Sequence, residues 1–172
     1  YLWDNPAAKN AFIKAAEIAK NAGRKVALSL SDSFCVSRHR ESFIKLVDDH
    51  IDILFANEDE ITNLYETSSL SKALEKLKKK CDLAAITIGE KGSILISNGK
   101  EIKIDPFILG KAVDTTGAGD IYAGAFLKGY ADGLKPELSA KIGSICAGQI
   151  VTQLGSRSNT DLLNLINSHL EA

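Results

Sequence analysis

The chain has 172 residues, of which 45% are hydrophobic and 25% charged, and this composition fits one soluble domain with enough apolar material for a core. Its net charge of −1 lacks the basic excess of proteins that bind nucleic acid or anionic membranes, so both classes of partner are excluded. The three cysteines are odd in number and far apart, which argues against a disulfide framework or a CxxC metal site and predicts buried, reduced thiols.

The first half of the chain is predicted to alternate between helices and short apolar strands. Asn5 and Pro6 form an ordinary helix start, and Gly23 ends that helix. The expected helices cover residues 5–23, 38–47, 58–65 and 71–80, and the expected strands cover residues 25–31, 51–56 and 83–89.

The second half begins with a hairpin and continues as helices. Asn-Gly between the alternating runs at 94–97 and 101–105 is the strongest short-range hairpin signal. Helices are expected over residues 118–130, 137–153 and 160–170. Together these elements predict a single α/β domain over residues 1–172, with a doubly wound, mainly parallel sheet, an added hairpin and helices on both faces.

The stretch "DTTGAGD", residues 114–120, stands at the start of a predicted helix. Gly117 and Gly119 remove side chains from the first turn, so unpaired backbone N–H groups can approach an anion, with the positive end of the helix dipole behind them. Asp120 would repel a bound anion, but it makes sense where a phosphoryl group is transferred and a carboxylate takes the proton of the attacking hydroxyl.

The alternative is that Asp120 is an ordinary first-turn carboxylate, while Asp114 and the threonines make turn hydrogen bonds. Two nucleotide-binding motifs are excluded. No GxxxxGK[ST] is present, and "GAGDIYAG" places its third glycine wrongly for the GxGxxG of a dinucleotide-binding oxidoreductase.

Two more polar stretches follow predicted strands, at the carboxyl ends where α/β proteins bind ligands. In "NEDE", Asn57 and Glu60 can orient water around Mg²⁺, although a capping box explains the same spacing. In "TIGEKG", Thr87, Gly89 and Gly92 can run backbone along a nucleotide, or form a simple turn into the hairpin.

These three stretches carry a family resemblance. "VDTTGAGD" followed by "AGAFL" resembles the second signature of the PfkB-type carbohydrate kinase family, which includes ribokinase and adenosine kinase. "NEDE" is similar to its NxxE motif and "TIGEKGS" to its TxGxxG nucleotide segment, in the same order and spacing. The run around "HIDILFANEDE" looks more like the adenosine kinase and sugar kinase branch.

The resemblance implies a ribokinase-like fold and ATP-dependent phosphorylation of a nucleoside or sugar hydroxyl. It makes Asp120 the general base, with Mg²⁺ and in some relatives a monovalent cation held by Asp114 and the loop near Gly155. By the same resemblance, Gly117, Ala118 and Gly119 form an anion hole, and Asn57 and Glu60 form a Mg²⁺ and phosphate network. The nucleotide is contacted by Thr87, Gly89, Gly92, Asp114 and Thr115. The adenine is flanked by residues 142–156.

The resemblance covers the C-terminal half of such a kinase, with the N-terminal part of the fold and its lid missing. The sequence begins at Tyr1 and contains no methionine, so we expect a piece of a longer chain. The expected partners are a small nucleoside or sugar, and a second copy of the chain or the missing N-terminal half. The alternative function is a nucleotide-binding fragment or oligomerisation module without activity of its own.

Two remaining features concern location and metals. No apolar run approaches the ~18 residues of a membrane span and no signal-peptide pattern is present, so a cytoplasmic location is expected. The histidines, His39, His50 and His169, show no metal-ligand spacing, and surface or helix-end positions are expected for them.

Overall fold

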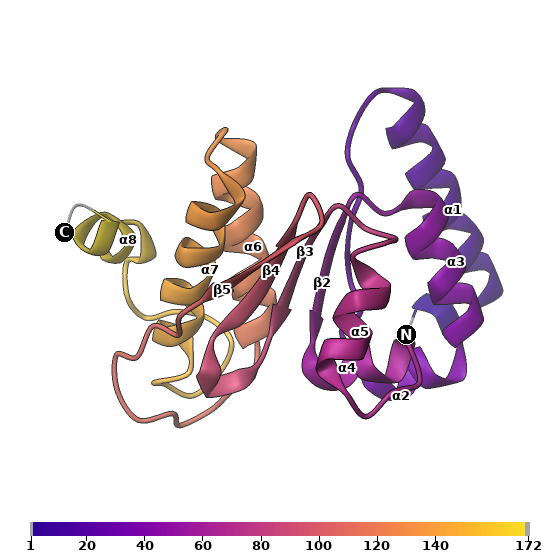
Figure 1. Cartoon of the computed structure of the whole chain (residues 1–172). Coiled ribbons are helices and arrows are strands. Elements are labelled where there is room, and N and C mark those ends of the chain that lie inside the picture. The colour runs from indigo at the N-terminus through magenta and orange to yellow at the C-terminus, as the bar shows by residue number, and fades with distance from the viewer. Residues whose placement is uncertain (1, 171–172) are drawn as a thin grey trace. The chain divides into compact units, whose positions relative to one another are not determined.

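The computed structural model describes residues 2–170, which divide into two compact units (Figure 1). Of the described residues, the first unit comprises 2–86 and Ile96–Lys100, and the second comprises Thr87–Leu95 and 101–170. The expectation of one domain over the whole chain stays a prediction.

Five strands form one mixed sheet in the order β1-β2-β3-β4-β5. The strands are β1 (Ala27–Ser29), β2 (Ile53–Asn57), β3 (Leu83–Thr87), β4 (Ser93–Ser97) and β5 (Lys100–Ile104). β1 pairs with β2 in parallel, with Leu28 opposite Leu54. The predicted hairpin is confirmed: β4 and β5 are joined by Asn98 and Gly99, which both have positive φ, as a type I′ turn requires.

The helical elements described in the first unit are the 3₁₀ turn η1 (Leu2–Asp4), α1 (Pro6–Asn21), α2 (Ser33–Arg38), α3 (Arg40–His50), α4 (Glu58–Leu64) and α5 (Leu70–Leu77). Four of them, α1, α2, α4 and α5, begin at side-chain caps that the sequence supplies, whereas α3 begins after His39 without one. The Asn5 side chain accepts from the N–H of Ala7, and Asp32 accepts from the N–H of Cys35. Trp3 is buried against Phe12 and Phe43, which ties η1 to α1 and α3.

The second unit contains a further 3₁₀ turn and three helices: η2 (Gly89–Lys91), α6 (Ala118–Ala131), α7 (Pro136–Ile150) and α8 (Leu162–Leu170). α6 and α7 run side by side (Figure 1). Their backbones approach closely at Gly143, where an added Cβ would lie 2.9 Å from the carbonyl oxygen of Tyr122. This packing fixes the start of α6, which carries the "DTTGAGD" stretch.

The observed elements confirm the predicted α/β class. The helix predicted over residues 38–47 corresponds to α3, whereas the short helix α2 before it and the turn η1 before α1 were not predicted. The prediction missed α2 because this helix, capped by Asp32, has only six residues, too few to show a clear periodicity.

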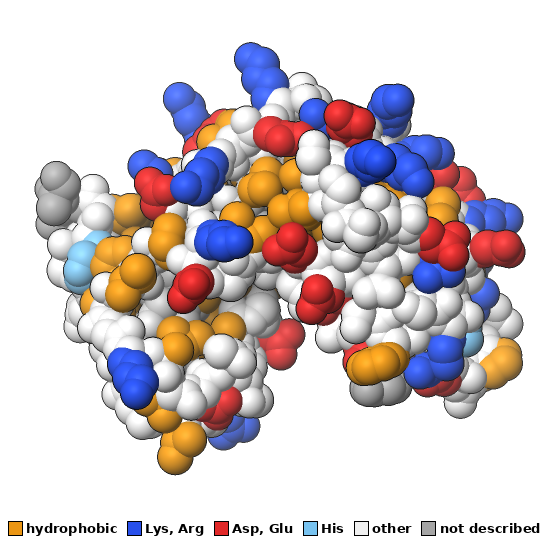
Figure 2. Space-filling view, turned by 60° about the horizontal axis from the view of Figure 1, so that its bottom comes forward, with side chains coloured by type: hydrophobic (Ala, Val, Ile, Leu, Met, Phe, Trp, Pro, Cys, Tyr) orange, Lys and Arg blue, Asp and Glu red, His pale blue; other side chains and the backbone are white. Residues whose placement is uncertain are grey.

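The surface carries both signs of charge. On the face shown in Figure 2, Lys and Arg side chains are interspersed with Asp and Glu. Cys35, Cys81 and Cys146 are free and buried, as predicted. Among the described residues, no helix combines the length and the apolar character needed to cross a membrane.

Candidate functional site

The start of α6 is built around Gly117. This residue has φ 79° and is the N-cap of the helix, where it provides no side-chain capping bond. A Cβ added to it would lie 2.5 Å from the Cβ of Ser156, so both the backbone conformation and the close approach require glycine. The first turn of α6 is therefore left without the side-chain cap that most helices carry.

The open first turn exposes hydrogen-bond donors. The N–H of Ala118 donates to the carbonyl of Thr115 at 3.1 Å, whereas those of Gly119 and Asp120 have no acceptor within the described part of the chain. A Cβ added to Gly119 would meet no atom within 4 Å. Unpaired N–H groups beside empty space at a helix N-terminus form the geometry of an anion site.

Asp120 lies in the same first turn. Its side chain is exposed and makes no hydrogen bond or ion pair with any described residue. It is not among the residues that line the adjoining pocket. The carboxylate is therefore free to meet a molecule outside that pocket, although an ordinary first-turn carboxylate would occupy the same position.

Asp114 organises the loop before α6. Its two carboxylate oxygens accept hydrogen bonds from the N–H groups of Thr116 and Gly155, each at 2.9 Å. These bonds, chiefly the one from Gly155, hold the pKa of Asp114 below its usual value. Asp114 thus makes the turn hydrogen bonds of the alternative reading and links this loop to the segment after α7.

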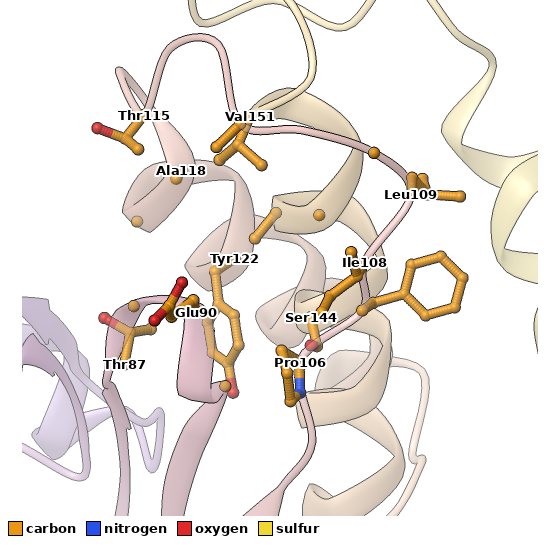
Figure 3. Close-up of a pocket in the computed structure, with 18 of the residues that line it drawn as sticks. Thr87, Glu90, Pro106, Ile108, Leu109, Thr115, Ala118, Tyr122, Ser144 and Val151 are labelled. Carbon is orange, nitrogen blue, oxygen red and sulfur yellow. The ribbon is translucent and has the colours of Figure 1, made fainter.

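A pocket of about 430 Å³ lies in the second unit (Figure 3). It brings together the residues predicted from two separate stretches of the sequence. Those residues are Thr87, Gly89 and Gly92 from the β3 end, and Thr115, Ala118 and Gly119 from the α6 start. Asp114, Gly117 and Asp120 lie beside these residues in the chain but do not line the pocket.

The β3 end is shaped by glycine. Gly92 has φ 91°, and an added Cβ would lie 2.2 Å from the carbonyl oxygen of Ile104. The N–H of Gly92 donates to Gly89, and its carbonyl accepts from Ile88. Gly92 therefore closes a tight turn against the end of β5 and the segment after it. This turn alone explains why the position is glycine, with or without a contact to a nucleotide.

The opposite wall falls partly within residues 142–156, the segment expected to flank adenine, whereas its 106–112 part was not predicted. It consists of residues 106–112, of Ser144, Ala147 and Gly148 from α7, and of Val151, the residue that follows α7. The 106–112 segment lies directly on α7, since a Cβ on Gly148 would be 2.0 Å from the carbonyl oxygen of Phe107. The sequence signal that could have indicated the 106–112 segment is its apolar run in a loop, in which Ile108 is 75% exposed.

Tyr122 forms part of the pocket wall and was also missed. Its hydroxyl shares a 2.8 Å hydrogen bond with the hydroxyl of Ser93. Burial raises the pKa of Tyr122 to about 12, so it remains a neutral phenol at physiological pH. The pocket is thus bounded by mostly uncharged groups. Apart from the anion site at the start of α6, this lining suits a flat, uncharged ring better than another anion.

Asn57 and Glu60 belong to the first unit, where they form a capping box. The Asn57 oxygen accepts from the N–H of Glu60 at 2.8 Å, and a Glu60 oxygen accepts from the N–H of Asn57 at 3.0 Å. The second Glu60 oxygen accepts from the Asn57 amide nitrogen at 2.9 Å. Burial raises the pKa of Glu60, which is only 6% exposed. The capping-box reading of "NEDE" is confirmed, while the role toward Mg²⁺ stays a prediction.

The known proteins to which the chain is similar include kinases of nucleosides and of ribose. The chain is 43% identical to the adenosine kinase of Sinorhizobium meliloti, covering 100% of this chain and 52% of that one with a TM-score of 0.93. The Arabidopsis thaliana ribokinase complexed with ribose and ATP is 27% identical, covering 92% and 52% with a TM-score of 0.75. The nucleoside kinase of Methanocaldococcus jannaschii is 29% identical over 132 residues, which are 77% of this chain and 43% of that protein.

The chain therefore spans about half the length of these relatives. Its α/β fold is ribokinase-like, as the sequence predicted. The model of the family described as pfkB family carbohydrate kinase matches residues 3–162. The chain belongs to the pfkB family of carbohydrate kinases.

Proposed function

We propose that the chain is the nucleotide-binding and catalytic-base half of a kinase that transfers a phosphoryl group from ATP to a hydroxyl of a nucleoside or sugar. The observation that carries this proposal is the pocket of the second unit. It joins the β3 end to an uncapped helix start, whose Gly119 and Asp120 N–H groups lack acceptors within the described chain. The ribokinase complexed with ribose and ATP supports the same assignment.

The pocket fits the two ends of ATP. Its largely apolar wall, formed by residues 106–112 and α7, suits a purine ring, and its other side presents backbone N–H groups suited to phosphate. In this proposal Thr87, Gly89 and Gly92 pass along the nucleotide, and Thr115 contacts its phosphate end. Bound Mg-ATP supplies the transferable phosphoryl group and the metal charge that neutralises it.

The chain's own residues then carry the chemistry. The Gly117–Gly119 turn presents its N–H groups to negative charge that grows on the phosphoryl oxygens. The Asp120 carboxylate accepts the proton of the acceptor hydroxyl, because it is exposed and has no partner within the described chain.

Asn57 and Glu60 fit Mg²⁺ through water more readily than as direct ligands. Each Glu60 oxygen already accepts one hydrogen bond from Asn57, and the side chain is buried. A carboxylate oxygen keeps a further lone pair, so Glu60 can still accept from a metal-bound water. Asp114 also keeps lone pairs for a monovalent cation beside the loop at Gly155.

The test is ADP release with Mg-ATP, with adenosine, ribose and fructose phosphates offered in turn. It is run on the 172-residue chain and on the longest polypeptide that contains it. Asp120→Asn should bind ATP as the wild type does but turn over at least ~10²-fold more slowly, which is the usual loss on removal of a general base. Asp132→Asn, at the end of the same helix, is the matched control and should retain turnover. Retained turnover in Asp120→Asn would defeat the assignment.

A second candidate follows from length, because the chain spans about half of its relatives. It is a nucleotide-binding fragment or oligomerisation module that lacks activity of its own. ATP binding without ADP release for every acceptor, in both polypeptides, would favour this second function. A cytoplasmic location, a homodimer and pairing with an N-terminal half stay predictions.

A further inference from the structure

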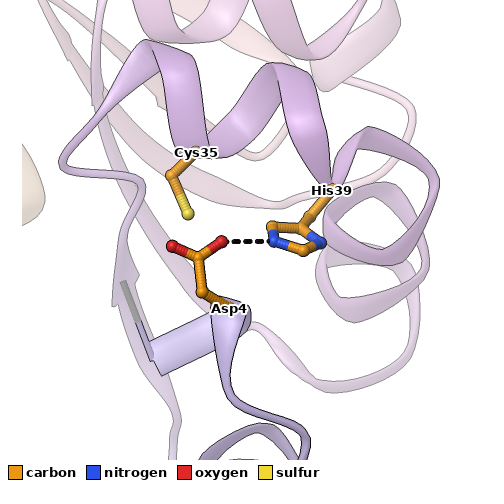
Figure 4. A group of neighbouring side chains, drawn as sticks. All are labelled: Asp4, Cys35 and His39. Atoms are coloured by element: carbon orange, nitrogen blue, oxygen red, sulfur yellow. Dashed lines mark hydrogen bonds and ion pairs between the residues drawn. The ribbon is translucent and has the colours of Figure 1, made fainter.

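A cluster of three metal-ligating side chains lies in the first unit, on residues that no part of the proposed function uses. Asp4 comes from η1, Cys35 from α2 and His39 from the C-cap of α2. One carboxylate oxygen, the thiol sulfur and one imidazole nitrogen all lie within 4.8 Å of one another. Figure 4 shows the sulfur and the imidazole ring both directed at the Asp4 carboxylate. We propose that Asp4, Cys35 and His39 form a binding site for Zn²⁺.

Helix geometry presents two of the ligands together. Cys35 and His39 are four residues apart, and the N–H of His39 donates to the carbonyl of Cys35 at 3.1 Å. Side chains at this spacing share one face of a helix. The third ligand arrives from the segment before α1, where the buried Trp3 anchors η1 and so fixes its neighbour Asp4.

The donor set selects the metal. Sulfur, imidazole nitrogen and carboxylate oxygen together suit Zn²⁺, whereas Mg²⁺ prefers oxygen ligands alone. Zinc bonds of ~2.0–2.3 Å in a tetrahedron separate neighbouring ligand atoms by about 3.3–3.6 Å. The His39 nitrogen now hydrogen-bonds the Asp4 oxygen at 2.7 Å. Binding therefore opens this pair by roughly 0.6 Å, while the sulfur already lies within 4.8 Å of both atoms, so rotation of the side chains can bring all three to bonding distance.

Access to the site is from the surface, on the Asp4 side. The side chains of Asp4 and His39 are 40% and 29% exposed, so water can complete the fourth coordination position. Cys35 is only 2% exposed, which leaves no room for a substrate at its sulfur. This burial argues against a cysteine nucleophile and is compatible with a small ion that enters between the three ligands.

Arg38 is the competitor for this site. Its guanidinium donates to both oxygens of Asp4, at 2.9 and 3.2 Å. The Arg38 side chain is 49% exposed, and exposed ion pairs contribute little to stability because water screens them. Arg38 can therefore swing into solvent when the ion binds. Its positive charge nevertheless opposes the ion, so removing it should strengthen binding.

The experiment is a calorimetric titration of Zn²⁺ into the metal-free, reduced chain, in the presence of a large excess of Mg²⁺. We expect saturation at one Zn²⁺ per chain. With Co²⁺ as a spectroscopic probe, a sulfur-to-cobalt charge-transfer band should grow to the same stoichiometry. Cys35→Ser and His39→Gln should each weaken Zn²⁺ binding at least ~10-fold, and Cys35→Ser should abolish the cobalt band.

Two further variants sharpen the test. Arg38→Gln should bind Zn²⁺ more tightly than the wild type, a change that a purely structural ion pair would not produce. His50→Gln, a histidine outside the cluster, should bind as the wild type does. Circular dichroism checks that each variant is folded. If Cys35→Ser does not fold, the comparison rests on His39→Gln, because the His39 side chain is partly exposed and its replacement should be tolerated.

Two results would overturn the proposal. One is the lack of saturable Zn²⁺ binding by the folded wild-type chain. The other is binding that neither Cys35→Ser nor His39→Gln weakens, which would place the ion elsewhere. Both are independent of phosphoryl transfer, because they are read from metal binding by residues of the first unit.

Discussion

Gly119 offers two substitutions, one that should raise stability and one that should weaken ligand binding. A Cβ at this position meets no atom within 4 Å, and its φ is not in the left-handed region. Alanine should therefore be tolerated and should stabilise the helix by at most ~1 kcal/mol. For a chain of this size, that gain raises the melting temperature by roughly 2–4 °C.

The same empty space is where the proposed phosphate site lies. Gly119→Val places a branched side chain beside the unpaired N–H groups and should block their approach to an anion. A hydrogen bond to a charged group contributes about 1.5–3 kcal/mol, so losing one weakens Mg-ATP binding roughly 10- to 100-fold. Isothermal titration calorimetry measures the affinity, and thermal unfolding measures the stability of the same samples.

Gly124→Ala is the matched control for this experiment. Gly124 is also an exposed glycine of α6 with no atom within 4 Å of an added Cβ, but it does not line the pocket. It should raise the melting temperature without changing ATP affinity. If Gly119→Val binds Mg-ATP as tightly as Gly124→Ala does, the start of α6 is not the phosphate site.

Two further substitutions test the local structure. Gly117→Ala should lower the free energy of unfolding by ~1–2 kcal/mol or more, because alanine is disfavoured at φ 79° and its Cβ would meet Ser156. Urea unfolding measures this free energy, and an unchanged value would contradict the cap geometry. Burial raises the pKa of Glu60 in the folded chain above its value in the unfolded chain. The contribution of Glu60 to the free energy of unfolding is therefore fully present below the unfolded-state pKa and is lost as pH rises through the folded-state pKa. The unfolding free energy of the wild type minus that of Glu60→Gln should therefore fall between mildly acidic and neutral pH, and parallel pH profiles would count against this account.

Local signals made much of the fold predictable from the sequence. Asn98 and Gly99 specify their own turn, and Asn57 with Glu60 specifies a capping box, because in each case the interacting groups are neighbours in the chain. The glycines of "DTTGAGD" likewise placed the start of α6 correctly at Ala118.

Contacts between segments that are far apart in the sequence could not be predicted from such local signals. The 106–112 wall of the pocket depends on how a loop lies along α7, which Gly148 permits from more than 30 positions away in the chain. Asp4 meets Cys35 and His39 across a similar separation. Periodicity and spacing carry no information on such pairs, so the histidines gave no metal-ligand pattern in the sequence even though His39 lies in a cluster of potential ligands.

The most direct test of the central claim is a titration of Mg-ATP into the ¹⁵N-labelled 172-residue chain, followed by the backbone amide resonances. We expect large, saturable shifts at Gly117, Gly119 and Asp120, accompanied by shifts at the β3 end and little change in α1. A well-dispersed spectrum in which the amides of the α6 start do not respond to saturating Mg-ATP would contradict the claim that this helix start is the phosphate site.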